Sequence, residues 1–101
     1  MYVVIVEFTI RTEQAAVFKQ RVLQQARDSL EREAECHVFD VCFDPARENF
    51  VLLYEVYTDK SAFDAHLASP HFLDFDATVQ PWISDKKLSL LKRASSDPIT
   101  A

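Results

Sequence analysis

The chain has 101 residues, a formal net charge of −5 and 49% hydrophobic side chains. This length suits one domain, the apolar share is too high for a disordered chain, and no apolar run is long enough to span a membrane. The acidic balance disfavours a nucleic-acid partner, which needs a basic face. Because the chain has no glycine, we also exclude the glycine-rich phosphate loops of Walker and dinucleotide-binding proteins.

A strand and a helix are predicted at the start of the chain. Tyr2 to Ile10 is rich in β-branched and aromatic residues, and both alternating sets are largely apolar, which is typical of a strand covered on both faces. Thr12 is the expected N-cap of a helix that ends in the charged block 31–35. The predicted apolar stripe of this helix consists of Ala15, Phe18, Val22, Ala26 and Leu30, and Gln25 lies outside that stripe.

Two further strands are predicted to form a hairpin. His37 to Phe43 alternates, and Phe50 to Tyr57 is apolar on both faces except for Glu55. The segment between them contains Pro45, which fixes φ, and ends on Asn49, which can adopt a positive φ. We therefore expect a turn over 44–49.

The two cysteines, Cys36 and Cys42, are predicted to be reduced. On one extended strand they would share a face about 20 Å apart, too far for a disulfide. The N-terminal segment lacks the basic stretch of a signal peptide. Both observations favour a cytoplasmic protein.

The second half of the chain predicts two helical segments and a last strand. Thr58 or Asp59 can cap a helix with the stripe Ala62, Phe63, His66 and Leu67. Pro70 interrupts it, residues 71–79 form further helical turns, and 84–93 form the strand. The order β-α-β-β-α-β predicts an α+β, ferredoxin-like fold. We expect one domain over 1–93 and a polar tail over 94–101.

A second copy of the chain is the expected cover for the free face of the sheet. A sheet of this topology carries helices on one face only, while its strands are apolar on both. Packing sheet against sheet in an isologous homodimer would bury the second face.

Several segments carry a resemblance to a known family. Phe39-Asp40-Val41, Asp44-Pro45, Tyr54-Glu55-Val56-Tyr57 and Ser69-Pro70-His71-Phe72 resemble the antibiotic biosynthesis monooxygenase (ABM) superfamily over nearly the whole chain. The resemblance implies a dimeric α/β barrel. It also implies one of the family's activities, which include cofactor-free oxygenation of quinols and anthrones, isomerisation of phosphorylated autoinducer-2, and haem degradation.

The chain departs from the family pattern in two places. Members often have Glu-Pro-Gly-Cys before the second strand, where this chain has Glu33-Ala34-Glu35-Cys36. The haem-degrading branch relies on an asparagine on the first strand and a tryptophan on the second helix. Here the only asparagine is Asn49 and the only tryptophan is Trp82, so that branch is disfavoured.

Three residues are candidates for acid–base catalysis. Glu55 lies in an otherwise apolar strand, where burial would raise its pKa towards neutrality. His66 lies on the apolar stripe of its helix and can reach the sheet, which would pair it with Glu55. His71 follows Pro70, and the resemblance puts it at the border of the cavity. Each also has a structural alternative: a paired carboxylate, a satisfied core histidine, and a side chain that fixes the Pro70 corner.

Aromatic residues are the candidates for substrate binding. Core packing is their ordinary role, yet eight phenylalanines in so small a domain would suit a pocket for a flat aromatic molecule. The residues proposed for this role are Phe39, Phe63, Phe72 and Trp82. A metal site built from His66, His71, Asp74 and Asp76 matches no strong ligand spacing, so no metal or cofactor is predicted.

Three functional hypotheses remain open. The favoured one is a cofactor-independent monooxygenase that deprotonates a quinol or related aromatic substrate with Glu55 or His66. The alternative is an isomerase of a small phosphorylated keto-sugar, whose phosphate would need Lys86, Lys87 or Arg93. The third is a non-catalytic dimeric ligand-binding module, which predicts a cavity filled by the domain's own aromatics.

Overall fold

The computed structural model describes residues 1–94 of the chain. Its elements, in chain order, are β1 (Tyr2–Ile10), the 3₁₀ helix η1 (Thr12–Gln14), α1 (Ala15–Arg32), β2 (Cys36–Asp44), β3 (Arg47–Tyr57), α2 (Lys60–Leu67), α3 (Pro70–Val79), the 3₁₀ helix η2 (Gln80–Trp82) and β4 (Ile83–Lys92). Ala94 is the one residue of the predicted tail inside the described part; the rest of the tail lies outside it. Within residues 1–94, no helix has the length and apolarity needed to cross a membrane.

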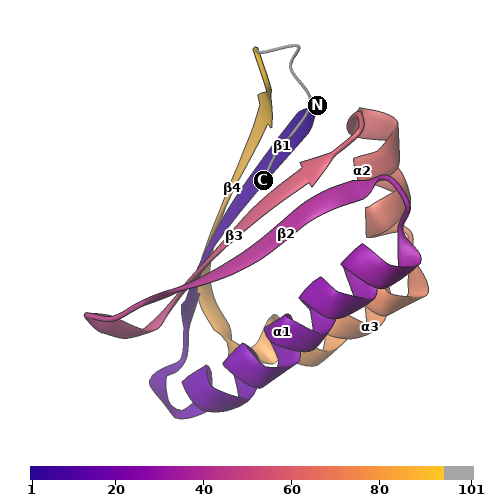
Figure 1. Cartoon of the computed structure of the whole chain (residues 1–101). Coiled ribbons are helices and arrows are strands. Elements are labelled where there is room, and N and C mark those ends of the chain that lie inside the picture. The colour runs from indigo at the N-terminus through magenta and orange to yellow at the C-terminus, as the bar shows by residue number, and fades with distance from the viewer. Residues whose placement is uncertain (95–101) are drawn as a thin grey trace.

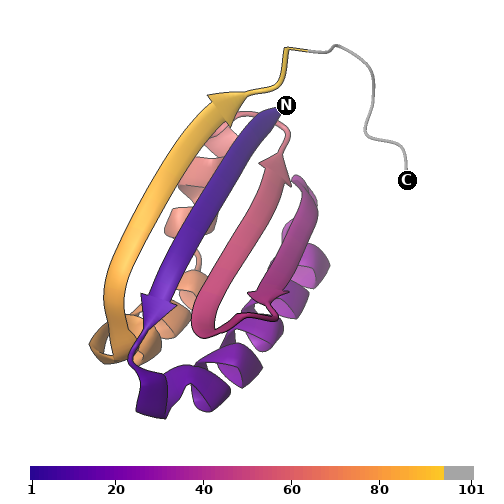
Figure 2. The same ribbon diagram turned by 90° about the vertical axis from the view of Figure 1, so that its left-hand side faces the viewer.

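The four strands form one antiparallel sheet in the order β2-β3-β1-β4. All helices lie on one side of this sheet (Figure 1). The view from the other side shows the strands uncovered, with the helices behind them (Figure 2). The predicted α+β, ferredoxin-like βαββαβ fold is confirmed.

The register of the central strands decides which side chains face the helices. Val4 pairs with Glu55 and Val6 with Leu53. Because side chains alternate along a strand, these positions all point to the helix side. Val4 and Leu53 belong to the buried core, so Glu55 is held on the core face by its neighbours.

Helix α1 corrects the predicted stripe. Phe18 and Val22 are buried as expected, whereas Leu30 is 46% exposed and Gln25 is 1% exposed. At about 100° per residue, Leu30 lies about 120° away from Phe18 around the helix, while Gln25 lies within about 20° of it. Repeated steps of four residues therefore drift off the buried face, and a polar residue takes the buried position. The expected Thr12 cap is also wrong, because residues 12–14 form η1 and α1 begins at Ala15 without a side-chain cap.

A bulge near the start of β2 separates the two cysteines. Cys36 pairs with Tyr57 and Val38 with Val56, so three residues of β2 oppose two of β3. This shift puts Cys36 on the buried face and Cys42 on the opposite, exposed one. The prediction that they share a face is wrong, while both are free thiols as expected.

The β2–β3 turn is tighter than predicted. Asp44 pairs with Arg47, which leaves a two-residue loop of Pro45 and Ala46. The Asp44 carboxylate accepts a hydrogen bond from the Ala46 backbone N–H at 2.8 Å, an Asx turn that closes the loop. No described residue has a positive φ, so Asn49 does not play its predicted part and lies within β3 instead.

Two caps position the second helical segment. Asp59 caps α2 by accepting from the Ala62 N–H at 2.8 Å, and Ser69 caps α3 by accepting from the Phe72 N–H at 3.3 Å. Pro70 occupies the first turn of α3, where its missing N–H costs nothing. His66 in the last turn of α2 and His71 in the first turn of α3 are thereby brought to the same corner.

Candidate active site

A cavity of about 80 Å³ lies between the sheet and the helices. We call its residues on strands the sheet wall and those on helices the helix wall. The sheet wall comprises Val4, Val6, Phe8, Phe39, Leu53, Glu55, Ile83, Lys86 and Leu88. The helix wall comprises Gln25, Phe63, His66, Leu67, Phe72, Phe75, Asp76 and Val79. The cavity is therefore mostly apolar, with a few polar side chains placed in it, as small-molecule sites are.

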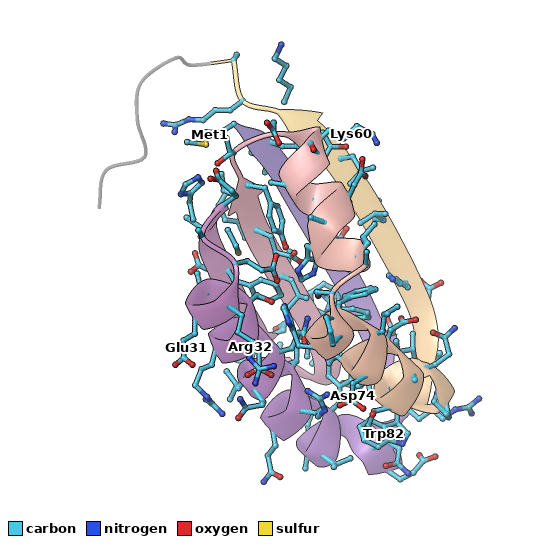
Figure 3. The ribbon with its side chains drawn as sticks, turned by 90° about the vertical axis from the view of Figure 1, so that its right-hand side faces the viewer. Met1, Glu31, Arg32, Lys60, Asp74 and Trp82 are labelled. Atoms are coloured by element: carbon cyan, nitrogen blue, oxygen red, sulfur yellow. The ribbon has the colours of Figure 1, made fainter. Side chains whose placement is uncertain are left out.

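The exposed members of the lining show where the cavity opens. Leu67 is 38% and Leu88 49% exposed, and Lys86 is also exposed. These residues come from the end of α2 and from β4, the uncovered edge strand. Figure 3 shows this side, with α2 and α3 in front of the sheet and β4 beside them. A small molecule would enter between β4 and the helices.

Glu55 supplies a buried carboxyl group on the sheet wall. Its side chain accepts a hydrogen bond of 2.6 Å from the Tyr57 hydroxyl, two residues along the same face of β3. Burial raises the pKa of Glu55 to about 7, and this effect exceeds the lowering by the Tyr57 hydrogen bond and by the charge of His66. Glu55 therefore exchanges a proton close to neutral pH.

Tyr57 and Cys36 stay protonated beside Glu55. Burial and the negative charge of Glu55 raise the pKa of the Tyr57 hydroxyl far above its usual range. Burial also raises the pKa of the Cys36 thiol to about 12. Tyr57 thus acts as a hydrogen-bond donor, and Cys36 is an unreactive packing residue.

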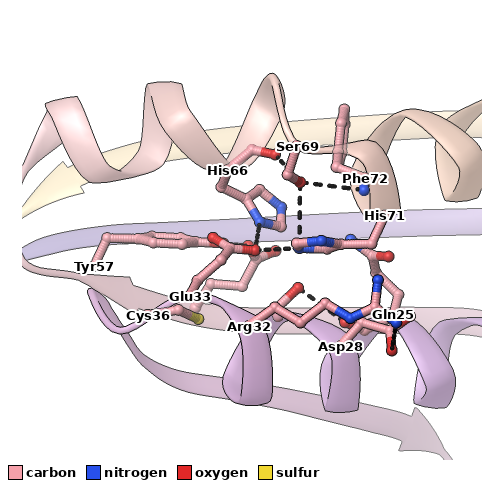
Figure 4. Close-up of polar contacts among 12 residues, drawn as sticks. Gln25, Asp28, Arg32, Glu33, Cys36, Tyr57, His66, Ser69, His71 and Phe72 are labelled. Carbon is pink, nitrogen blue, oxygen red and sulfur yellow. Dashed lines mark hydrogen bonds and ion pairs between the residues drawn. The ribbon is translucent and has the colours of Figure 1, made fainter.

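Glu33 binds both histidines of the second helical segment, His66 and His71. Its Oε2 atom lies 2.8 Å from His66 Nδ1 and is also hydrogen-bonded to His71 Nε2. Figure 4 shows the two imidazoles converging on this carboxylate from α2 and α3. Burial alone would raise the pKa of Glu33, but the hydrogen bonds and charges of the two histidines outweigh it, so the pKa is lowered. Glu33 is therefore an anion at neutral pH.

The charge of Glu33 fixes the proton positions on both rings. A carboxylate only accepts hydrogen bonds, so the nitrogens that face it, His66 Nδ1 and His71 Nε2, must carry protons. In neutral His66 this leaves the lone pair on Nε2. Glu33 thus defines the tautomer and the orientation of the neutral His66 ring, in the way a carboxylate orients the histidine of a hydrolase.

The end of α1 explains how Glu33 reaches this position. Glu33 is the C-cap of α1 in an extended conformation, and its N–H still bonds to the Ser29 carbonyl at 3.1 Å. The chain then turns into β2, because the Cys36 N–H bonds to the Glu33 carbonyl at 3.1 Å. The helix end thus places the Glu33 carboxylate against His66 and His71.

The same three residues are the donor set that could hold a metal ion. One ligand atom each from Glu33, His66 and His71 lies within 4.8 Å of the others, and two histidines with one carboxylate can bind a divalent metal. An ion would have to displace the protons that now join the histidines to Glu33. The set of His66, His71, Asp74 and Asp76 is not assembled, because Asp74 instead forms an ion pair of 2.8 Å with Arg21.

The structure brings together most of the residues singled out from the sequence. Glu55, His66 and the three aromatics Phe39, Phe63 and Phe72 line the cavity. The expected Glu55–His66 pair does not form a hydrogen bond. Glu55 bonds to Tyr57 instead, and His66 bonds to Glu33.

Two of the singled-out residues lie off the cavity lining. His71 is buried and bonds to Glu33, while its ring nitrogen also lies 3.2 Å from the Ser69 hydroxyl. Trp82 packs partly buried against the core from η2. In Figure 3 it lies at the end of the helix layer opposite Lys60.

Sequence reasoning missed Glu33 and Gln25. The charge pattern predicts only that Glu33 belongs to the block that ends the helix, although Glu33 and Cys36 are the two residues of the family's Glu-Pro-Gly-Cys pattern that this chain retains. Gln25 was placed off the buried stripe. At about 100° of rotation per residue, Gln25 lies on the same side of the helix as Phe18, and this count predicts its burial where steps of four residues do not.

Comparisons with known proteins show a family and a fold that this chain shares. A family model described as antibiotic biosynthesis monooxygenase matches residues 1–78. A Nitrosomonas europaea protein, provisionally described as an antibiotic biosynthesis monooxygenase, is 26% identical with a TM-score of 0.89; the match covers 94% of this chain and all 100% of that one. No curated protein sequence matches the chain significantly.

Two further solved structures share the fold at lower identity. Rv0793 from Mycobacterium tuberculosis is 20% identical with a TM-score of 0.86, and the match covers 96% of this chain and 98% of that one. PA3566 from Pseudomonas aeruginosa is 21% identical with a TM-score of 0.85, and the match covers 93% and 94% respectively.

Proposed function

The chain belongs to the antibiotic biosynthesis monooxygenase family, and on that premise we propose that it is a cofactor-independent monooxygenase of a quinol or related electron-rich phenol. The family and the similar structures support a general monooxygenase-like function. The observation that carries the finer proposal is Glu55, a buried carboxyl with a pKa of about 7 in the wall of an apolar cavity.

The proposed reaction begins with a proton transfer. Glu55 takes the proton of a substrate hydroxyl, because a carboxylate with a raised pKa is a stronger base than an ordinary one. His66, held by Glu33 with its Nε2 lone pair available, is the second proton carrier. The apolar lining excludes water and positions the anion for oxygen.

The resulting phenolate then reacts directly with O2. A new C–O bond forms at a ring carbon, that carbon loses its hydrogen, and the O–O bond breaks. One oxygen atom stays in the product and the other leaves as water. The sum is dihydroxyarene plus O2 to hydroxyquinone plus water, in which the substrate supplies all four electrons. No external reductant is needed.

Oxygen uptake by metal- and flavin-free protein tests the proposal. With a panel of quinols and anthrones, we expect uptake that EDTA leaves unchanged and that Glu55→Gln lowers more than tenfold, since this variant loses the base. Glu48→Gln, on an exposed part of the same strand, is the matched control and should retain full activity. Full activity of Glu55→Gln would overturn the assigned role.

One observation keeps the isomerase alternative open. Of the three cations considered for a phosphate, Lys86 lines the cavity at its exposed edge. Lys87 instead lies 3.9 Å from Glu7, on the uncovered face. An isomerase would exchange a substrate C–H proton with solvent without consuming oxygen, and NMR with phosphorylated keto-sugars would detect it. The non-catalytic alternative predicted a cavity filled by aromatics, and the cavity of about 80 Å³ argues against it.

A homodimer formed through the uncovered face of the sheet is part of this proposal. Large apolar side chains lie on that face, among them Tyr54 at 37% and Leu91 at 50% exposure. A second copy would cover them with the same surface, as an isologous interface does. The solution mass should be twice 11.6 kDa, and a monomer at micromolar concentration would contradict it. We also propose a cytoplasmic location, which the two free cysteines favour.

A further inference from the structure

The side-chain amide of Gln25 is buried without a partner. Gln25 is 1% exposed, and neither its Oε1 nor its Nε2 atom has a hydrogen-bond partner in the described part of the chain. Its side chain lines the cavity from α1. The neighbouring Ser29 hydroxyl does not help, because it donates to the Gln25 backbone carbonyl at 2.8 Å. The amide therefore offers both an acceptor and a donor that the fold leaves unused.

Such a group is costly to keep for structure alone. A buried amide that gave up its hydrogen bonds to water destabilises the fold, and an apolar side chain of the same length would avoid that loss. Its neighbours on the same helix face, Val22 and Ala26, are apolar. An unpaired amide on a cavity wall is instead the arrangement of a binding site that awaits a polar ligand atom.

The position of Gln25 relative to Glu55 restricts the ligand. Gln25 belongs to the helix wall and Glu55 to the sheet wall, so the two residues line the cavity from its opposite layers. The volume of about 80 Å³ corresponds to several water-sized positions, which is enough for one small ring. A ring with oxygens at both ends would present one to each wall.

We propose that Gln25 is a substrate-binding residue that selects single-ring aromatics carrying a second oxygen opposite the hydroxyl that Glu55 deprotonates. This inference rests on the proposed function for the role of Glu55. The amide N–H donates to that second oxygen and the amide carbonyl accepts from its hydroxyl. A site built to pair with a hydroxyl rejects the analogue that lacks it, because the buried amide then stays unpaired.

Binding under strictly anaerobic conditions tests the inference without any turnover. Calorimetry compares hydroquinone, which has both oxygens, with phenol, which has one. The wild type should bind hydroquinone at least about tenfold more tightly. Gln25→Met, which keeps the chain length and removes the amide, should lose this preference, bind phenol as the wild type does, and melt at the same or a higher temperature. Gln24→Met is the matched control, because Gln24 is exposed on the same helix, and it should retain the preference.

Several outcomes would overturn the inference. If Gln25→Met still prefers hydroquinone to phenol, another group binds the second oxygen. A lower melting temperature with equal loss of both ligands would show that the amide supports the fold. Absence of hydroquinone binding to the wild type would also overturn it.

An amide signal gives a readout that does not depend on the variant folding. In the wild-type protein, the side-chain NH₂ resonances of Gln25 should shift with hydroquinone and stay in place with phenol. Equal shifts with both would contradict the inference. Binding selectivity without oxygen uptake would refute the proposed function alone, whereas oxygen uptake without selectivity would refute the role of Gln25 alone.

Discussion

Glu33, which is partly buried, and Glu55, which is buried, are two carboxylates near the same histidine, yet their environments drive their pKa values in opposite directions. Glu33 is bound by two imidazoles and its pKa is lowered. Glu55 has one neutral donor, Tyr57, and burial raises its pKa to about 7. The number and charge of the donors thus decide which carboxylate is a fixed anion and which can exchange a proton. Carboxyl groups separated in this way mark the acid–base assignments of a site.

The largest expected effect is on stability, when the fixed anion is removed. Glu33→Gln leaves two buried imidazoles without their charged acceptor and should destabilise the protein by about 3 to 5 kcal/mol. Because the pKa of Glu33 is lowered on folding, its stabilisation is present above its unfolded value of 4.5 and is lost as the pH falls. Urea unfolding at pH 7 measures the loss, and an unchanged midpoint would show that Glu33 is not the anchor of both rings.

The opposite sign is expected for Glu55. Its pKa rises from 4.5 to about 7 on folding, so ionising Glu55 costs stability as the pH rises from 4.5 through 7. Glu55→Gln removes that cost and should stabilise the protein by about 2 to 3 kcal/mol at pH 8, with little effect at pH 4.5. Unfolding curves at both pH values test this. A variant less stable than the wild type at pH 8 would contradict the raised pKa.

The histidine that touches both the cavity and Glu33 should matter for turnover. His66→Ala removes the oriented ring and should lower oxygen uptake more than tenfold while the protein stays folded. His37→Ala is the control, because His37 is an exposed histidine of β2 that bonds to Thr58. If the two variants have equal activity, His66 is a packing residue.

The smallest expected effect sharpens the difference between the carboxylates. Tyr57→Phe removes the one hydroxyl that stabilises ionised Glu55, so its pKa should rise further, by a unit or less for a single hydrogen bond. Since the proposed base must be ionised, the rising limb of the pH–rate profile should move to higher pH. A shift to lower pH, or no shift, would show that the ionisation of Glu55 does not control the reaction rate.

The sequence predicted the elements better than their polar contacts. The placement of Glu55 on the buried face follows from strict alternation in β3, and that of His66 from the stripe of α2; both are local properties. Gln25 was misplaced because a stripe counted in steps of four drifts around a long helix. The cysteines were misplaced because a bulge, which no residue type in 36–38 signals, shifts the alternation by one.

By itself, the sequence determined the order of strands and helices, the helix cap at Thr58 or Asp59, and the apolar character of both sheet faces, because each depends on neighbours along the chain. Only the tertiary structure decided which buried polar groups meet. Glu33 and His71 lie 38 positions apart, and their contact depends on the end of α1, the corner at Pro70 and the packing of both helices on one sheet. The pKa of Glu55 likewise depends on burial by residues remote in the chain, which turns an ordinary carboxylate into a base for neutral pH.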